Sequence, residues 1–205
     1  MKRVLVATGN PGKIRELAEA LLPTGIEVVG MDHLDDRTEV EEAGTTFEEN
    51  ARLKAEQYSL RTDLPVLADD SGIEVDALNG DPGVRSARYG GSALDDPGRC
   101  RYLLEQIADV TEPQRRTARF RCVLALARAG QTRAVFEGVV EGHLLTGPLG
   151  ENGFGYDPIF FHPPSGCTTA QLTTAEKQRI SHRGQAIEAL IEAIRAGDPR
   201  LAGLD

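Results

Sequence analysis

The sequence predicts an α/β protein in which helices pack around a mixed β-sheet. In the first half of the chain, short apolar runs alternate with segments whose apolar residues recur every three or four positions, as in strands alternating with amphipathic helices. The second half contains two long alternating runs, 117–127 and 132–140, separated by the turn 129–131. That spacing is typical of an antiparallel hairpin. Together the two halves indicate one mixed sheet, in two lobes about a cleft.

Length and composition restrict the class of protein. The chain has 205 residues, and we expect a single domain over 1–205 with a flexible tail after about residue 197. Hydrophobic residues make up 40% and charged residues 27%, as in soluble globular proteins. The net charge of -9 argues against binding to nucleic-acid polymers, which requires a basic surface. This net charge is compatible with a small anionic ligand bound by a few local cationic side chains.

The cysteine count and the charges near the N-terminus indicate the cellular compartment in which we expect the protein. The three cysteines show no C-x-x-C spacing, and so sparse a count fits a reducing cytoplasm. Charges at Lys13, Arg15 and Glu16 interrupt the first 22 residues, so we expect neither a signal peptide nor a membrane span. The sequence therefore predicts a cytoplasmic protein without a membrane partner.

A strand at 3–7 leads into a loop and then a helix. Asn10 suits the N-cap of that helix and Pro11 its first position. Free N–H groups at a helix N-terminus attract phosphate, and Lys13 adds a cation there. The Walker pattern G-x-x-x-x-G-K-[ST] is absent. Two interpretations stay open, a phosphate site and an ordinary capped helix.

A second strand near 25–30 is followed by an acidic loop, most of which we expect to be a solvated edge. Glu42 is the exception, because it ends the acidic run just before the next helix. Thr46 and Glu49 have the spacing of a capping box for a helix of about 47–60. Lys54 falls in a mostly apolar stripe of this helix, so its ammonium either extends to solvent or points into a site.

The apolar run 65–68 is typical of a buried strand and leads directly into Asp69 and Asp70. Adjacent strand residues point to opposite faces, so these two carboxylates cannot share one cleft. A carboxylate at the end of a buried strand lies where open α/β sheets bind ligands, which suggests a ligand for a hard cation or a general base. The other interpretation is a turn over Asp69–Gly72, with a sharp exit at Gly72.

The segment 147–158 is rich in glycine and proline and precedes a short apolar strand at 159–161. Phe154 stands between two glycines in this segment, and Tyr156 directly follows the second of them. Such rings either stack against a flat ligand or pack against the protein, and the sequence favours neither.

Three further helices complete the chain. One covers about 96–109, a short one is capped by Thr173, and the last is capped by Ser181. His182 and Arg183 then lie in the first turn of the last helix, where a cation opposes the helix dipole. Helix stability does not explain this pair, and we expect it to belong to a site.

Six motifs follow one another along nearly the whole chain. They are TGNPGK at 8–13, GTTFEENARLKA at 44–55, LADDSGIEVDAL at 67–78, GDPGVRSARY at 80–89, GENGFGYDPIFF at 150–161 and AEKQRISHRGQA at 175–186. Any one of them alone is weak, but the set in this order is very specific. The chain resembles the inosine triphosphate pyrophosphatase (Ham1/RdgB-like) family of house-cleaning nucleotide diphosphatases.

The resemblance implies a two-lobed α/β fold with a long central mixed sheet, flanking helices and an active-site cleft between the lobes. It implies a homodimeric, Mg²⁺-dependent enzyme that hydrolyses ITP, dITP and XTP to the monophosphate and pyrophosphate. Asp70 would be the catalytic carboxylate and a metal ligand, with Lys13 beside it in catalysis. Glu42 would be the second metal ligand, with Glu41 as the alternative alignment.

The substrate-binding residues are carried over in the same way. The residues that would meet the phosphates are Thr8, Gly9, Asn10, Pro11, Gly12, Lys13, Lys54 and, nearby, Ser71. Those that would form the wall beside the base are Phe154, Gly155, Tyr156 and Asp157. Those that would complete the nucleotide pocket are Lys177, His182 and Arg183.

Three other functions remain to be distinguished. A nucleotide-binding regulator would use the same pocket without turnover. A Maf-like pyrophosphatase would prefer modified pyrimidine nucleotides. A structural subunit of a dimer would bind no metal.

Overall fold

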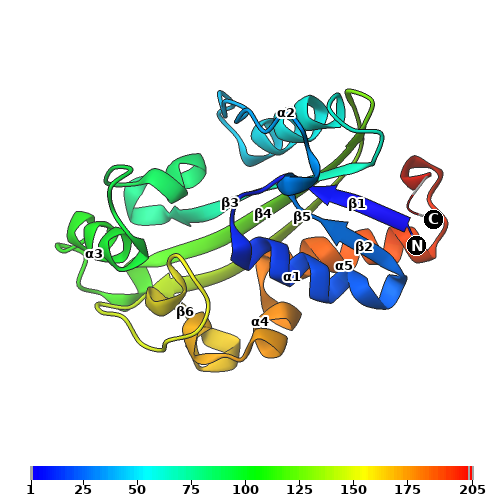
Figure 1. Cartoon of the computed structure of the whole chain (residues 1–205). Coiled ribbons are helices and arrows are strands. Elements are labelled where there is room, and N and C mark those ends of the chain that lie inside the picture. The colour runs from blue at the N-terminus through cyan, green and yellow to red at the C-terminus, as the bar shows by residue number, and fades with distance from the viewer. Residues whose placement is uncertain (1, 203, 205) are drawn as a thin grey trace. The chain divides into compact units, whose positions relative to one another are not determined.

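In the computed structural model, which describes residues 2–202 and 204, the chain forms a seven-stranded sheet with helices around it (Figure 1). The strand order is β2-β1-β3-β4-β5-β6-β7. The strands are β1 (Lys2–Val6), β2 (Ile26–Val29), β3 (Val66–Val75), β4 (Thr117–Arg128), β5 (Gln131–Leu144), β6 (Phe160–His162) and β7 (Cys167–Thr168). β1 pairs in parallel with β2 and β3, whereas β6 pairs antiparallel with β5 and β7. The predicted mixed sheet is confirmed.

Four of the described α-helices begin directly after the predicted capping residues Asn10, Thr46, Thr173 and Ser181. The α-helices are α1 (Pro11–Leu21), α2 (Phe47–Ser59), α3 (Asp96–Gln106), α4 (Thr174–Ile180) and α5 (His182–Arg195). Asn10 accepts hydrogen bonds from the first turn of α1, and Thr46 and Glu49 form a complete capping box on α2. Within the described part of the chain, every helix is too short or too polar to cross a lipid bilayer.

The turn interpretation of Asp69–Gly72 is wrong, because β3 continues through both aspartates to Val75. Gly72 has a different reason to be glycine. A Cβ there would clash with the Ser86 hydroxyl, which accepts from the Ile73 N–H at 2.9 Å and donates to the Gly83 carbonyl at 2.6 Å. The strand therefore needs glycine for space at its side and not for a reversal of the chain.

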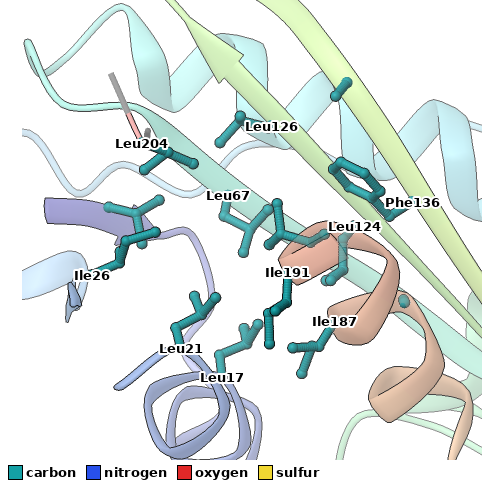
Figure 2. Packing of buried hydrophobic residues seen from close by; sticks show 14 of the residues in the cluster. Leu17, Leu21, Ile26, Leu67, Leu124, Leu126, Phe136, Ile187, Ile191 and Leu204 are labelled. Carbon is teal, nitrogen blue, oxygen red and sulfur yellow. The ribbon is translucent and has the colours of Figure 1, made fainter. Parts of the chain in front are cut away.

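The described chain divides into two compact units. The first contains the residues up to 70, 122–138 and those from 185 onward, and the second contains 71–121 and 139–184. In the first unit, α1 and α5 contribute Leu17, Leu21, Ile187 and Ile191 to one hydrophobic cluster, together with apolar residues of β1, β3 and β4 (Figure 2). The tail beyond residue 197, which we expected to be flexible, adds to this cluster Leu201 and Leu204, which are 1% and 3% exposed.

The second unit has its own hydrophobic cluster, built on β3, β4, β5, α3 and the segment around β6. Arg116 is buried in this unit and donates to the backbone carbonyls of Ile107, Val110, Leu144 and Leu145 at 2.8–3.2 Å. Burial lowers the pKa of this guanidinium. Arg116 thus satisfies carbonyl groups at several chain ends that would otherwise be buried without donors.

Candidate active site

Lys54 of α2 joins the predicted acidic residues of the first unit. Its Nζ donates to Glu42 Oε1 at 2.7 Å, to Asp70 Oδ1 at 3.1 Å and to the Asp69 carbonyl at 2.9 Å. Because Glu42 Oε1 and Asp70 Oδ1 both accept from the same nitrogen atom, the two carboxylates lie close to each other. The Lys54 side chain is 11% exposed, so it points into a site and does not extend to solvent. Glu41, the alternative to Glu42, is exposed.

The electrostatics of this group favour a further cation. Burial raises the pKa of Asp70, against the opposing attraction of Lys54. Burial lowers the pKa of Lys54, but the attraction of Asp70, Glu42 and Asp69 outweighs it, so this pKa is raised overall. Asp70 Oδ2 is buried and accepts no hydrogen bond from any described residue. A buried carboxylate oxygen of this kind is suited to a metal ion or a water molecule.

Asp69 interacts with a different set of groups from Asp70, as strand alternation predicts. Its carboxylate forms an ion pair with Lys13 of α1 through Oδ1 and accepts from the Cys122 thiol through Oδ2 at 3.3 Å. Lys13 thereby reaches the same end of β3 as Lys54 does. Both lysines of the predicted phosphate site lie beside the two aspartates.

The loop before α1 is an ordinary capped helix start, and this limits how it could bind phosphate. Asn10 Oδ1 accepts from the Gly12 and Lys13 N–H groups at 2.8 and 3.3 Å, and Thr8 Oγ1 accepts from the Asn10 N–H at 3.2 Å. The first-turn donors are therefore already used by the cap. The Lys13 ammonium is the group of this loop best able to meet an anion.

A second set of predicted residues surrounds Phe154 in the second unit. Lys177 Nζ lies 4.5 Å from the centre of the half-buried Phe154 ring, and Arg183 Cζ lies 5.5 Å from it. Both are within the range of cation–π attraction. Arg183 is 1% exposed and donates from Nη2 to Ser71 Oγ at 2.9 Å. The structure thus brings together four predicted residues from β3, α4, α5 and the Gly-rich segment.

Asp157 fixes this arrangement. Its carboxylate accepts from Lys177 Nζ at 2.7 Å, from the Phe154 N–H at 2.9 Å and from Thr169 Oγ1 at 2.8 Å. A Cβ at Gly153 would clash with the same carboxylate. The buried Asp157 therefore anchors the loop that carries Phe154 and holds Lys177 over the ring.

The rings of two predicted residues, Tyr156 and His182, contact other parts of the protein. Tyr156 is buried in the core of the second unit, and its hydroxyl donates to the Ser86 carbonyl at 2.8 Å. Of the two interpretations of this ring, packing is the one the structure shows. His182 stacks on Phe120, with 4.8 Å between ring centres and 16° between planes. Gly155 is held by its N–H, which donates to Asp96 Oδ2 at 2.7 Å.

Sequence reasoning missed the partners of Asp69 and the stacking of Phe120. Phe120 and Cys122 lie in the alternating run 117–127, a pattern that indicates burial but no particular partner. One signal was available for Asp69, since a nearby anion would offset the unfavourable helix dipole at Lys13 in the first turn. Nothing in the sequence indicated which acidic residue supplies it.

Comparisons with known proteins identify the family of this chain. The family model of the Ham1 family matches residues 4–193. A dITP/XTP pyrophosphatase of Thermus thermophilus is 50% identical over 197 residues, covering 96% of this chain and 94% of the relative. One of Vibrio parahaemolyticus is 48% identical over 198 residues, covering 96% and 98%.

Solved structures give the same result. The structure of a Ham1 protein from Coxiella burnetii matches with a TM-score of 0.87 at 39% identity, covering 96% of this chain and 100% of that one. The Staphylococcus aureus Ham1 protein matches with a TM-score of 0.84 at 40% identity and the same coverage. The family match spans almost the entire sequence, and the protein described here belongs to the Ham1 family.

Proposed function

We propose that this protein is a dITP/XTP pyrophosphatase, which hydrolyses ITP, dITP and XTP to the nucleoside monophosphate and pyrophosphate and so removes non-canonical purine nucleotides. Relatives named for this activity match nearly the whole chain at 48% and 50% identity. One observation carries the chemistry. Lys54 bonds to both Glu42 and Asp70, and Asp70 Oδ2 accepts no hydrogen bond from the described residues.

Glu42 and Asp70 suit Mg²⁺ as the divalent cation. Mg²⁺ is usually held by one or two carboxylates together with substrate phosphates and water, and not by a cage of protein ligands alone. The described residues contain no group of three or more His, Cys, Asp or Glu arranged to hold a metal. A pair of carboxylates that also needs the substrate fits this preference. When bound there, Mg²⁺ neutralises charge on the phosphate oxygens.

The two lysines bind the triphosphate. Hydrolysis of a phosphoanhydride depends mainly on charge neutralisation and on an oriented nucleophile. The Lys13 ammonium carries three donors, so it can keep its Asp69 contact and still meet phosphate oxygen. Lys54 already donates to three oxygens, so it must release one of them to meet phosphate. Their fixed positions on α1 and α2 set where the polyphosphate lies.

Asp70 positions the attacking water. A water molecule donates to Oδ2, and its proton passes to Asp70 as its oxygen bonds to one of the two phosphorus atoms that flank the α–β bridge. The bond from that phosphorus to the bridging oxygen breaks, and pyrophosphate separates from the monophosphate. A base placed in this way contributes about 10²–10⁴-fold to the rate.

The second unit binds the base. Phe154 offers a flat ring, and Arg183 offers guanidinium donors held by Ser71, the residue that follows Asp70 in the chain. Hypoxanthine and xanthine carry an oxygen at C6, which accepts from such a donor. Adenine carries an amino group there, which would leave the donor without an acceptor. The arrangement therefore favours 6-oxopurines over adenine.

We expect Arg183→Ala to lower the ratio of kcat/KM for ITP to that for ATP by about 10–100-fold, because one donor to the C6 oxygen is lost. Steady-state kinetics with both nucleotides measure the ratio. Arg179→Ala, at an exposed position of the preceding helix, is the control and should leave the ratio unchanged. An unaltered ratio in the folded Arg183 variant would assign base recognition to other residues.

The proposal as a whole is tested by a nucleotide panel in which phosphate and pyrophosphate are measured separately. With Mg²⁺, we expect pyrophosphate from ITP, dITP and XTP. No turnover would favour the regulator, and a preference for dTTP or UTP would favour the Maf-like enzyme. The family resemblance also supports a homodimer in the cytoplasm, and sedimentation equilibrium tests the dimer.

A further inference from the structure

We propose that the Cys122 thiol is a positioning group for the Lys13 ammonium, acting through the Asp69 carboxylate. The inference rests on the proposed function, in which Lys13 binds the triphosphate. It assigns a role to Cys122, which is buried on β4, and to Asp69 of β3, whose backbone carbonyl accepts from Lys54.

The Asp69 carboxylate is held at both of its oxygens. Oδ1 pairs with Lys13 Nζ, and Oδ2 accepts from Cys122 Sγ at 3.3 Å. The Asp69 side chain is 0% exposed and that of Lys13 is 15% exposed. Burying a carboxylate costs free energy, and donors to its oxygens reduce that cost. Because the thiol fixes Oδ2, the plane of the carboxylate is fixed, and with it the direction in which Oδ1 meets Lys13.

Lys13 needs such a partner. It lies in the first turn of α1, where the helix dipole repels a cation, and its side chain has several rotatable bonds. The ion pair with Asp69 compensates for the unfavourable dipole and selects one side-chain conformation. Of the three donors on the ammonium, one is used by Asp69, and the others can meet phosphate. A Lys13 ammonium held in this way binds phosphate with less loss of conformational freedom.

Cys122 can act on Asp69 without being essential to the core. It is fully buried on β4, the strand next to β3 in the sheet, and a thiol is a weak donor in a small apolar side chain. Its replacement by alanine or valine removes the donor and keeps the position apolar, and serine restores a donor. Cys167, which is half-buried on β7, is the matched control. Cys100 is not suitable, because its thiol donates to the Gly155 carbonyl.

The test compares wild type with Cys122→Ala, Cys122→Val, Cys122→Ser and Cys167→Ala. Calorimetry measures the Kd for inorganic tripolyphosphate in EDTA, and kinetics give kcat and KM for dITP with Mg²⁺. We expect the Ala and Val variants to raise both the Kd and KM by about three- to tenfold, as for loss of one ordinary hydrogen bond, since a thiol is a weak donor, with kcat changed much less. Cys122→Ser should return both constants toward wild type, and Cys167→Ala should match wild type.

The outcomes separate the two proposals. Unchanged tripolyphosphate binding in the folded Ala or Val variant would overturn the positioning role. Tighter binding would overturn it too, because it would mean that Asp69 competes with phosphate for Lys13. Should either variant fail to fold, the other and Cys122→Ser carry the comparison. If wild type binds tripolyphosphate with this dependence on Cys122 but does not hydrolyse dITP, the proposed function fails and the positioning role stands.

Discussion

We expect Asp70→Asn to lower kcat for dITP by about 10²–10⁴-fold, the usual contribution of a positioned base. Asparagine has nearly the shape of aspartate but cannot take the proton of the attacking water, and it is a poor ligand for Mg²⁺. The protein should remain folded. In the folded protein, burial raises the pKa of Asp70, so the folded state holds this proton more tightly than the unfolded chain does. The ionised group therefore costs stability at neutral pH, and a neutral amide relieves that cost.

Kinetics with dITP and thermal unfolding in EDTA check this prediction together. We expect the large loss of kcat with a Tm no lower than that of wild type. Asp63→Asn, at an exposed position just before β3, serves as the control and should change neither quantity. Near-normal kcat in Asp70→Asn would remove this residue from the assigned role.

The second large effect is expected for Lys54→Met in the absence of metal. This change leaves the Glu42 and Asp70 carboxylates close together without the cation that they share, and leaves the Asp69 carbonyl without that donor. Removing one partner of a buried ion pair typically costs about 3–5 kcal/mol of unfolding free energy. We expect a loss of this size in urea unfolding with EDTA. Because the same two carboxylates bind Mg²⁺ in our account, added Mg²⁺ should stabilise the variant more than it stabilises wild type.

A matched control lies on the same helix. Arg52 pairs with Glu48 four residues earlier, at 2.7 Å, but both side chains are exposed. Arg52→Met should therefore change the unfolding free energy by less than about 1 kcal/mol, with no dependence on Mg²⁺. If Lys54→Met behaved like this control, or if Mg²⁺ stabilised it no more than wild type, the two carboxylates would not form the metal site.

The local structure of this protein could be predicted from the sequence because its causes are local. Asn10, Thr46 and Glu49 cap helices through hydrogen bonds within a few residues, and the structure shows these caps. The alternating run of the hairpin likewise fixes which residues share a face. Because Lys54 falls in an apolar stripe, the sequence already indicated that its ammonium either extends to solvent or points into a site.

The errors concern contacts between residues far apart in the chain. Gly72 has the character of a turn residue, but the Ser86 hydroxyl that requires glycine there is packed beside the strand. Tyr156 follows Gly155 in a glycine-rich segment, as a ligand-binding ring could, yet its hydroxyl bonds to the same distant segment. No local pattern reports such packing. The roles given to Glu42, Asp70 and the residues around Phe154 remain predictions, although the structure brings the members of each set together.

The most direct test of the account is Mn²⁺ binding, followed by the loss of the free-ion signal in electron paramagnetic resonance. Mn²⁺ takes the oxygen ligands that Mg²⁺ takes, and Glu42→Gln removes one of the two carboxylates that we assign. The account predicts that this variant binds Mn²⁺ at least about tenfold more weakly than wild type, as expected for a lost charged ligand. Glu41→Gln, one residue away and exposed, should bind Mn²⁺ as wild type does. Equal affinity in wild type and Glu42→Gln, or weakening in Glu41→Gln alone, would contradict it.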